Sequence, residues 1–108
     1  MKLPIDTLIA RRKLTDYLLA WRPEDDKSAF LARAGYTLEM AVRMMADLRA
    51  QLLPLDAGFL KHTEYGDKYA IRGKLKGPNG RSLRGVSVWM TENATGKTKF
   101  VTLFADKT

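Results

Sequence analysis

The sequence predicts an α+β fold in which three N-terminal helices pack on one face of a three- to four-stranded antiparallel meander sheet. Apolar residues recur at helical spacing up to about residue 53, and two alternating runs in the second half flank the turn signal Gly77-Pro78-Asn79-Gly80. A chain of 108 residues supports one hydrophobic core, so residues 1–108 are expected to form a single domain. Its helical part covers about residues 7–53 and its sheet part about residues 65–105.

The first helix is predicted from about Thr7 to Trp21, after a lead-in that can form an edge strand at residues 2–5. Asp6 or Thr7 can cap this helix, and Pro23 stops it. One helix face carries apolar residues at the i, i+3, i+4, i+7 spacing, namely Leu14, Tyr17, Leu18 and Trp21.

The second helix is predicted from Asp26 to Ala34, with Gly35 as its C-terminal stop. The third runs from Leu38 to Leu53, with Thr37 as a cap and Pro54 as its end. Its apolar stripe, widened by two methionines, consists of Leu38, Met40, Ala41, Val42, Met44, Met45, Leu48 and Leu52. The residues expected on its other side are Glu39, Arg43 and Asp47.

A hairpin begins near Tyr65 and ends near Met90. Pro78 presets φ in the turn between its two strands, while Asn79 and Gly80 tolerate the positive φ that a tight reversal needs. These features predict an antiparallel pair of strands.

The remaining segments of the second half are a connector, a turn and a third strand. Residues 54–64 are expected to be the connector, and they contain His62, the only histidine. A turn at residues 92–97 leads into Thr98 to Phe104, which is rich in β-forming residues.

Strand alternation predicts which side chains share a face of the sheet. One face of the first strand carries Lys68, Ala70, Arg72 and Lys74. In the second strand Val86, Val88 and Met90 are expected to face the helices, so that Trp89 points to the opposite, open face. Residue type alone instead favours a partly buried Trp89, and a bulge at Gly85 would reverse the outer half of the strand. With Val101 and Leu103 pointing inward, the open face displays Arg72, Lys74, Ser87, Trp89, Phe100 and Thr102.

The net charge of +7 is concentrated in the sheet half of the chain. Residues 1–53 hold nine Lys and Arg against seven Asp and Glu, whereas residues 54–108 hold ten against five. This excess favours a polyanionic partner such as RNA, because each neutralised phosphate releases counterions. The alternative is that the lysines only discourage edge pairing. The expected nucleic-acid-binding residues combine cations with a ring that stacks on bases: Lys68, Lys74, Lys76, Arg81, Arg84 and Trp89.

The chain resembles a family of small bacterial domains of unknown function. The resemblance rests on short motifs spread over the chain, at residues 12–19, 26–30, 35–36, 65–69, 77–81, 88–89 and 100–103. The order of elements is in turn similar to the barnase, EndoU, colicin and RelE superfamily of toxin ribonucleases. That similarity implies that Lys27, early in the second helix, and Arg72, Trp89 and Thr102 on the sheet converge on a phosphodiester. Ser28 departs from this pattern, because several of these nucleases have a histidine there.

Metal-independent RNA cleavage needs an acid, a base and cations that stabilise the phosphorane. His62 is the candidate acid or base, Lys27 and Arg72 would hold the phosphate, and Thr102 would donate a hydrogen bond. The alternative is that His62 is an exposed connector residue. Residues 24–26 are three acidic residues at a helix start, which favours capping over metal binding. No metal and no organic cofactor is expected.

Three hypotheses for the function remain open. The first is an RNA-binding protein that acts as a ribonuclease toxin and is neutralised by an acidic antitoxin or immunity protein. The second is a non-catalytic module that binds nucleic acid or an acidic protein, and the third is a homodimer formed through the edge at Thr98 to Phe104. The chain contains no cysteine, no apolar run of membrane-spanning length and no signal peptide at its start, so a cytoplasmic location without membrane contact is expected.

Overall fold

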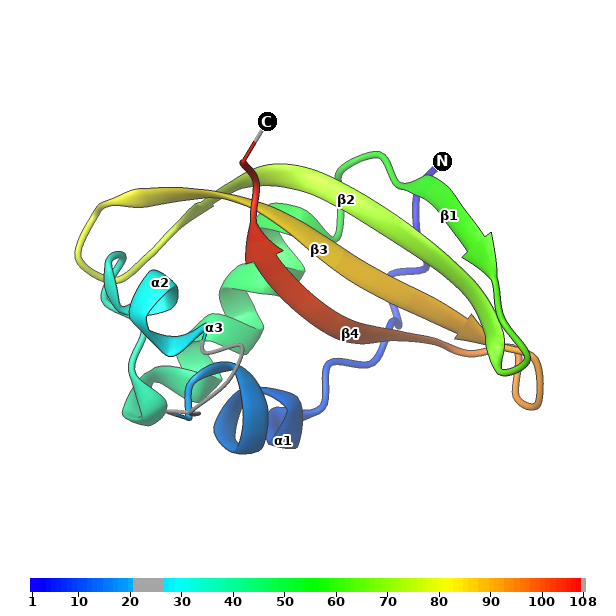
Figure 1. The fold of residues 1–108 in the computed structure, drawn as a ribbon, viewed down its shortest axis with the longest axis horizontal. Helices are drawn as coiled ribbons and strands as arrows, with labels where there is room; N and C mark the ends of the chain where they lie inside the picture. Colours follow the sequence, from blue (N-terminus) through cyan, green and yellow to red (C-terminus); the bar gives the residue numbers. More distant parts are fainter. Residues whose placement is uncertain (21–26, 108) are drawn as a thin grey trace.

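The computed structural model describes residues 1–20 and 27–107. Within these residues four antiparallel strands form one sheet in the order β1-β2-β3-β4, and the helices lie on one face of it (Figure 1). The strands are β1 (Gly58–His62), β2 (Gly66–Lys76), β3 (Ser82–Glu92) and β4 (Thr98–Ala105). This arrangement confirms the predicted α+β fold with N-terminal helices and a meander sheet. We call the face under the helices the covered face and the opposite one, over which no described helix lies, the open face.

The helical segments are short and change pitch. α1 (Arg11–Lys13) continues into a π-helical turn, η1 (Leu14–Leu18), and α2 covers Ser28–Ala32. The third segment joins a 3₁₀ turn, a helix and a second π-helical turn, which are η2 (Leu38–Met40), α3 (Ala41–Asp47) and η3 (Leu48–Leu52). The predicted third helix is therefore present almost over its full length.

The first helix begins later than predicted because residue 8 pairs with the sheet. The backbone N–H of Leu8 donates to the Thr98 carbonyl at 2.9 Å, and the N–H of Phe100 donates to the Leu8 carbonyl at 2.8 Å. This parallel bridge holds the chain extended where a helix from Thr7 was expected. The predicted residues Trp21, Pro23 and Asp26 lie outside the described residues.

The hydrophobic core fills the space between the helices and the covered face. Fully buried side chains from the helices meet fully buried side chains from the strands, and the set includes Leu14, Leu18, Leu31, Met44, Leu48, Leu52, Ile71, Leu75, Trp89, Phe100 and Leu103. Two residues of the predicted stripe, Leu38 and Val42, are exposed instead, and Met44, which was expected only to widen the stripe, is fully buried. The stripe of the third helix is thus rotated relative to the prediction.

Asp47 was expected on the exposed side of the third helix, but it is buried. Its carboxylate accepts a hydrogen bond from the Tyr36 hydroxyl at 2.6 Å and an ion-paired one from Arg43 Nε at 3.1 Å. Burial, and then the Asp47 carboxylate, raise the pKa of Tyr36 above its usual range. A buried carboxylate is tolerated here because both of its partners are donors.

The predicted connector contains a strand. Residues 58–62 pair with β2 as an edge strand, whereas the fourth strand had been expected at residues 2–5. All five residues of β1 are exposed, so no alternation of apolar and polar residues marks it in the sequence.

The hairpin turn forms as predicted and is fastened to the end of α2. The Gly77 N–H donates to the Arg81 carbonyl at 2.9 Å, and Gly80 has φ of 86°. The Asn79 backbone N–H donates to the Ala34 carbonyl at 3.2 Å, and a Cβ added at Gly77 would lie 2.1 Å from that same oxygen. Only glycine permits this close approach of the two backbones.

The expected facing of β3 is wrong. Trp89 is 0% exposed on the covered face, where its ring lies edge-on to Phe100 at 5.1 Å, and its Nε1–H donates to Ser87 Oγ at 2.8 Å. The alternation of β3 therefore puts Val86, Val88 and Met90 on the open face. Their burial comes from the side chains of the flanking strands, because β3 is an inner strand of the sheet.

A bulge in β4 decides which of its aromatic residues is exposed. Val88 pairs with Thr102 and Trp89 with Phe100, so Val101 is an extra residue in β4. Phe100 therefore joins Trp89 on the covered face, while Thr102 and Phe104 lie on the open face. The sequence had suggested Gly85 as the place for a bulge.

Candidate nucleic-acid interface

Cations gather on the open face. The register of the strands places seven of them there, from all four strands: Lys61, Lys68, Arg72, Lys74, Lys76, Arg84 and Lys99. Lys68, Arg72 and Lys74 thus share one face, as expected. Arg84 joins them because the facing of β3 is the reverse of the predicted one. Lys61 and Lys99 join them, and Lys99 is paired with Glu92 at 3.2 Å.

Two pairs of like charge face each other directly across neighbouring strands. Lys61 of β1 is opposite Lys68 of β2, and Lys74 of β2 is opposite Arg84 of β3. Like charges in this position destabilise a sheet. No carboxylate in residues 1–20 and 27–107 forms an ion pair with any of these four side chains. The open face thus holds positive charge that the described part of the protein does not neutralise.

Arg72 and Phe104 lie between the two cation pairs. Both residues belong to one row across the sheet, on either side of Val86. Arg72 Nη1 donates to Asp106 Oδ1 at 2.9 Å, which fixes the guanidinium on the surface, and the Phe104 side chain is 41% exposed. The combination of cation and ring that the sequence assigned to Trp89 is supplied by Phe104 instead.

Thr102 lies in the neighbouring row, opposite Val88. Its Oγ1 atom is buried and has no hydrogen-bond partner among the described residues. Thr102 shares the open face with Arg72 as predicted, but in this conformation its hydroxyl does not reach solvent.

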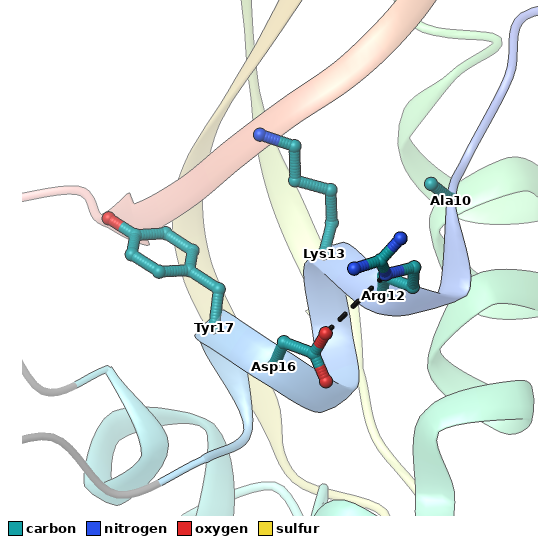
Figure 2. A pocket seen from close by; sticks show the side chains of 5 residues that line it. All are labelled: Ala10, Arg12, Lys13, Asp16 and Tyr17. Carbon is teal, nitrogen blue, oxygen red and sulfur yellow. Dashed lines mark ion pairs between the residues drawn. The ribbon is translucent and has the colours of Figure 1, made fainter.

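Lys27 lies in the helical layer, away from the open face. It is the N-cap residue of α2, and its Nζ is 3.1 Å from Tyr17 Oη and 4.9 Å from the centre of that ring. A hollow of about 450 Å³ beside Tyr17 is lined by Ala10, Arg12, Lys13, Asp16 and Tyr17 (Figure 2). Arg12 is paired with Asp16 there at 3.6 Å, and Lys13 and Tyr17 extend in the same direction from the helix (Figure 2).

His62 ends β1 at the edge of the sheet. Its Nδ1 contacts the Asp67 carboxylate, and its ring centre lies 4.8 Å from that of Phe59. The His62 side chain is 78% exposed. Of the four predicted catalytic residues, the structure brings only Arg72 and Thr102 onto one face, while Lys27 and His62 lie elsewhere.

Lys76 and Arg81 are exposed near the hairpin turn. Lys76 is opposite Ser82, and the Arg81 backbone N–H donates to Asn79 Oδ1 at 2.9 Å. These two cations extend the positive region beyond the pair formed by Lys74 and Arg84.

Sequence reasoning missed three residues of the open face, Lys61, Lys99 and Phe104. Lys61 was missed because β1 was interpreted as a connector. Phe104 was left out although alternation places it on the same face as Thr102. The bulge at Val101 changed the facing of Phe100 and left that of Phe104 as alternation predicts. One hint for Lys61 was present in the sequence, namely that it precedes His62. Lysines are common in exposed edge strands, so its residue type alone did not single it out.

The fold and its surface place this protein in a class of α+β domains. In this class one face of the sheet is not covered by helices and carries cations without ion-pair partners among the described residues. The described residues hold no group of three or more His, Cys, Asp or Glu side chains placed to bind a metal ion. None of the helices in the described part of the chain is long and apolar enough to cross a membrane.

The chain belongs to the family described as domain of unknown function DUF6883, whose model matches residues 5–107. This agrees with the resemblance to a family of unknown function. No curated protein and no solved structure matches the chain.

Proposed function

We propose that this protein binds single-stranded nucleic acid, in particular RNA, through the open face. The observation that carries the proposal is the presence of two like-charge pairs, Lys61 with Lys68 and Lys74 with Arg84. Each pair lowers the stability of the sheet, and a phosphate placed between its two side chains relieves that repulsion.

The spacing of the pairs suits an extended strand. Lys68 and Lys74 are six residues apart on β2, which is about 20 Å at the rise of a β-strand. A single strand of several nucleotides spans this distance, with phosphates at both pairs. Arg72 and the exposed ring of Phe104 lie between them, where bases can stack.

The salt dependence of binding tests the proposal. If the four paired cations each neutralise one phosphate, the affinity for single-stranded RNA falls about 50-fold between roughly 50 and 200 mM salt. The double variant Lys74→Gln with Arg84→Gln retains two of these contacts, so its affinity falls only about 7-fold over the same range. Binding is measured by fluorescence anisotropy in EDTA.

The matched control removes two charges from the helical layer. The variant Arg11→Gln with Lys13→Gln has the same net charge as the open-face variant, but its changes lie in α1. It is expected to keep the salt dependence of the unmodified protein. Equal loss of affinity in both variants would show that only net charge matters and would contradict an interface on the open face.

A second candidate function, metal-independent RNA cleavage, is supported by the contact between His62 and Asp67. A carboxylate at Nδ1 favours the tautomer with a proton on that nitrogen, and Nε2 is then able to accept a proton. His62 follows Lys61, so a phosphate held by the pair of Lys61 and Lys68 would be near this end of β1.

Cleavage of labelled RNA in EDTA tests this second candidate. His62→Ala is expected to abolish cleavage and to retain binding, because the four paired cations are unchanged. Binding without cleavage by the unmodified protein would leave the first proposal alone. A toxin of this kind inhibits growth on expression, and its acidic antitoxin or immunity protein would cover the same cations in the cytoplasm.

A homodimer through the edge at Thr98 to Phe104 is a weaker candidate. The backbone of Leu8 already bonds to Thr98 and Phe100 along this edge, so a second copy would have to displace it there. Sedimentation analysis of the protein with and without residues 1–9 would measure the effect of this segment on self-association.

A further inference from the structure

A hollow of about 360 Å³ opens between the two cation pairs of the open face. Its lining consists of Asp56, Gly58, Phe59, Leu60, Ala70 and Arg72. Ala70 lies between Lys68 and Arg72 on the same face of β2, so the hollow is in the path of a strand that contacts both pairs.

The floor of the hollow exists because two small residues face each other. Gly58 of β1 is directly opposite Ala70 of β2. A Cβ added at Gly58 would meet nothing within 4 Å, so the space above this residue is open. Larger side chains at these two positions would close the hollow.

The walls offer two kinds of contact to a flat ring. Leu60 is the extra residue of the bulge in β1, and its side chain is half exposed. On the other side is Arg72, whose guanidinium is held by Asp106. An aliphatic side chain and a guanidinium plane both pack well against an aromatic face.

The rim carries an acceptor. Asp56 is ion-paired with Lys2 at 3.4 Å and with the N-terminal amine at 3.8 Å, which holds its carboxylate beside the hollow. Amino and imino groups on the edges of bases are donors that a carboxylate accepts. A phosphate is disfavoured at this position, because Asp56 would repel it.

We propose that this hollow takes one unpaired nucleobase of the strand bound to the open face, an inference that rests on the proposed function. The base lies on Gly58 and Ala70, between Leu60 and Arg72, while its neighbouring phosphates contact the cation pairs. The protein therefore binds bases as well as backbone, and it distinguishes single strands from a bare polyanion.

The test compares two RNA-like strands of about eight nucleotides, a length that spans both cation pairs, one with bases and one fully abasic. The unmodified protein is expected to bind the strand with bases more tightly, by about 5- to 150-fold for each base that stacks. In Gly58→Leu, whose side chain projects into the hollow, this preference falls by about the contribution of one base, because bases can still stack on Phe104, and the salt dependence of binding is unchanged.

The control is Ser82→Leu, which adds the same side chain to an exposed position of β3 outside the hollow. This variant is expected to keep the preference for bases, and thermal unfolding verifies that both variants are folded. Equal binding of the two strands to the unmodified protein, or an intact preference in Gly58→Leu, overturns the inference while nucleic-acid binding itself stands. Failure to bind either strand overturns the proposed function and this inference together.

Discussion

The covered and open faces consist of side chains from the same strands, but the covered face is packed and hydrogen-bonded internally whereas the open face carries positive charge that is unpaired among the described residues. On the covered face Trp89, Phe100 and Ile71 are almost completely buried, and Ser87 donates to the Ile71 carbonyl at 3.1 Å and accepts from Trp89. On the open face apolar residues of β3 are also buried, but cations lie around them, and four of these have no ion-pair partner among the described residues: Lys61, Lys68, Lys74 and Arg84. The comparison indicates that the covered face mainly stabilises the fold and that the open face is the one available for binding. One face satisfies its polar groups internally, and the other leaves charge for a ligand.

The largest expected effect is on the covered face. Trp89→Ala should lower the free energy of unfolding by about 3–5 kcal/mol, because it removes the largest fully buried side chain and leaves Phe100 without its ring partner. Urea denaturation measures this change. Phe104→Ala on the open face is the matched comparison and should cost less than about 1 kcal/mol. A stable Trp89→Ala variant that loses RNA affinity would show that this residue acts on the open side.

The next effect concerns the buried pair of Tyr36 and Asp47. The folded protein holds the Tyr36 proton more tightly than the unfolded chain, so this contribution to stability is complete below pH 10 and declines as the pH rises above the ordinary tyrosine value of 10.0. The free energy of unfolding should fall by about 1.4 kcal/mol for each pH unit above that value. Tyr36→Phe should remove this part of the decline. An identical pH profile for the two proteins would contradict the raised pKa.

A smaller effect is expected from one change in a like-charge pair. Lys74→Glu places a carboxylate opposite Arg84, so it should raise stability by about 0.2–1 kcal/mol. The same change removes one phosphate contact and should lower the affinity for RNA about 5-fold at 0.1 M salt, or more. Thermal unfolding and anisotropy measure the two quantities. A loss of both stability and affinity would mean that the pair is not repulsive in the folded protein.

The smallest effect is expected at the ion pair of Arg72 and Asp106. The Asp106 side chain is only 16% exposed, but that of Arg72 is 59% exposed and solvent screens the pair, so Asp106→Asn should change stability by about 1 kcal/mol or less. Removal of the negative charge should raise the affinity for RNA by no more than about 5-fold. A decrease in affinity would show that Asp106 positions Arg72 for the ligand, in which case Arg72→Lys would reproduce it.

The parts of the fold that could be predicted are those with strong local signals. The turn of Gly77 to Gly80 combines residues that each favour a reversal, and the third helix has a long apolar stripe. The facing of β3 could not be predicted, because alternation gives two sets of side chains and both sets are apolar enough to be core. Trp89 with Ser87 forms a self-satisfied polar pair only once the chain is folded.

The sequence predicted that the candidate site is positively charged, but it did not predict which side chains lie next to one another there. Lys68, Arg72 and Lys74 alternate along one strand, so their common face follows from the sequence. The facing of Lys61 and of Phe100 depends on two bulges, at Leu60 and Val101, and no glycine or proline marks either position. Lys27 could not be placed, because its contact with Tyr17 joins two separate helical segments.

Two of the three hairpin turns, the one after β2 and the one after β3, differ in how much of the protein depends on them. The turn at residues 77–80 is bonded to the end of α2, so an insertion there would separate the hairpin from the helical layer. The turn that joins β3 to β4 lies at the other end of the sheet from the turn that joins β2 to β3 (Figure 1), and its residues Ala94 and Thr95 are exposed. A peptide tag or a fluorescent label inserted between Ala94 and Thr95 would therefore report on ligand binding while both faces of the sheet remain intact.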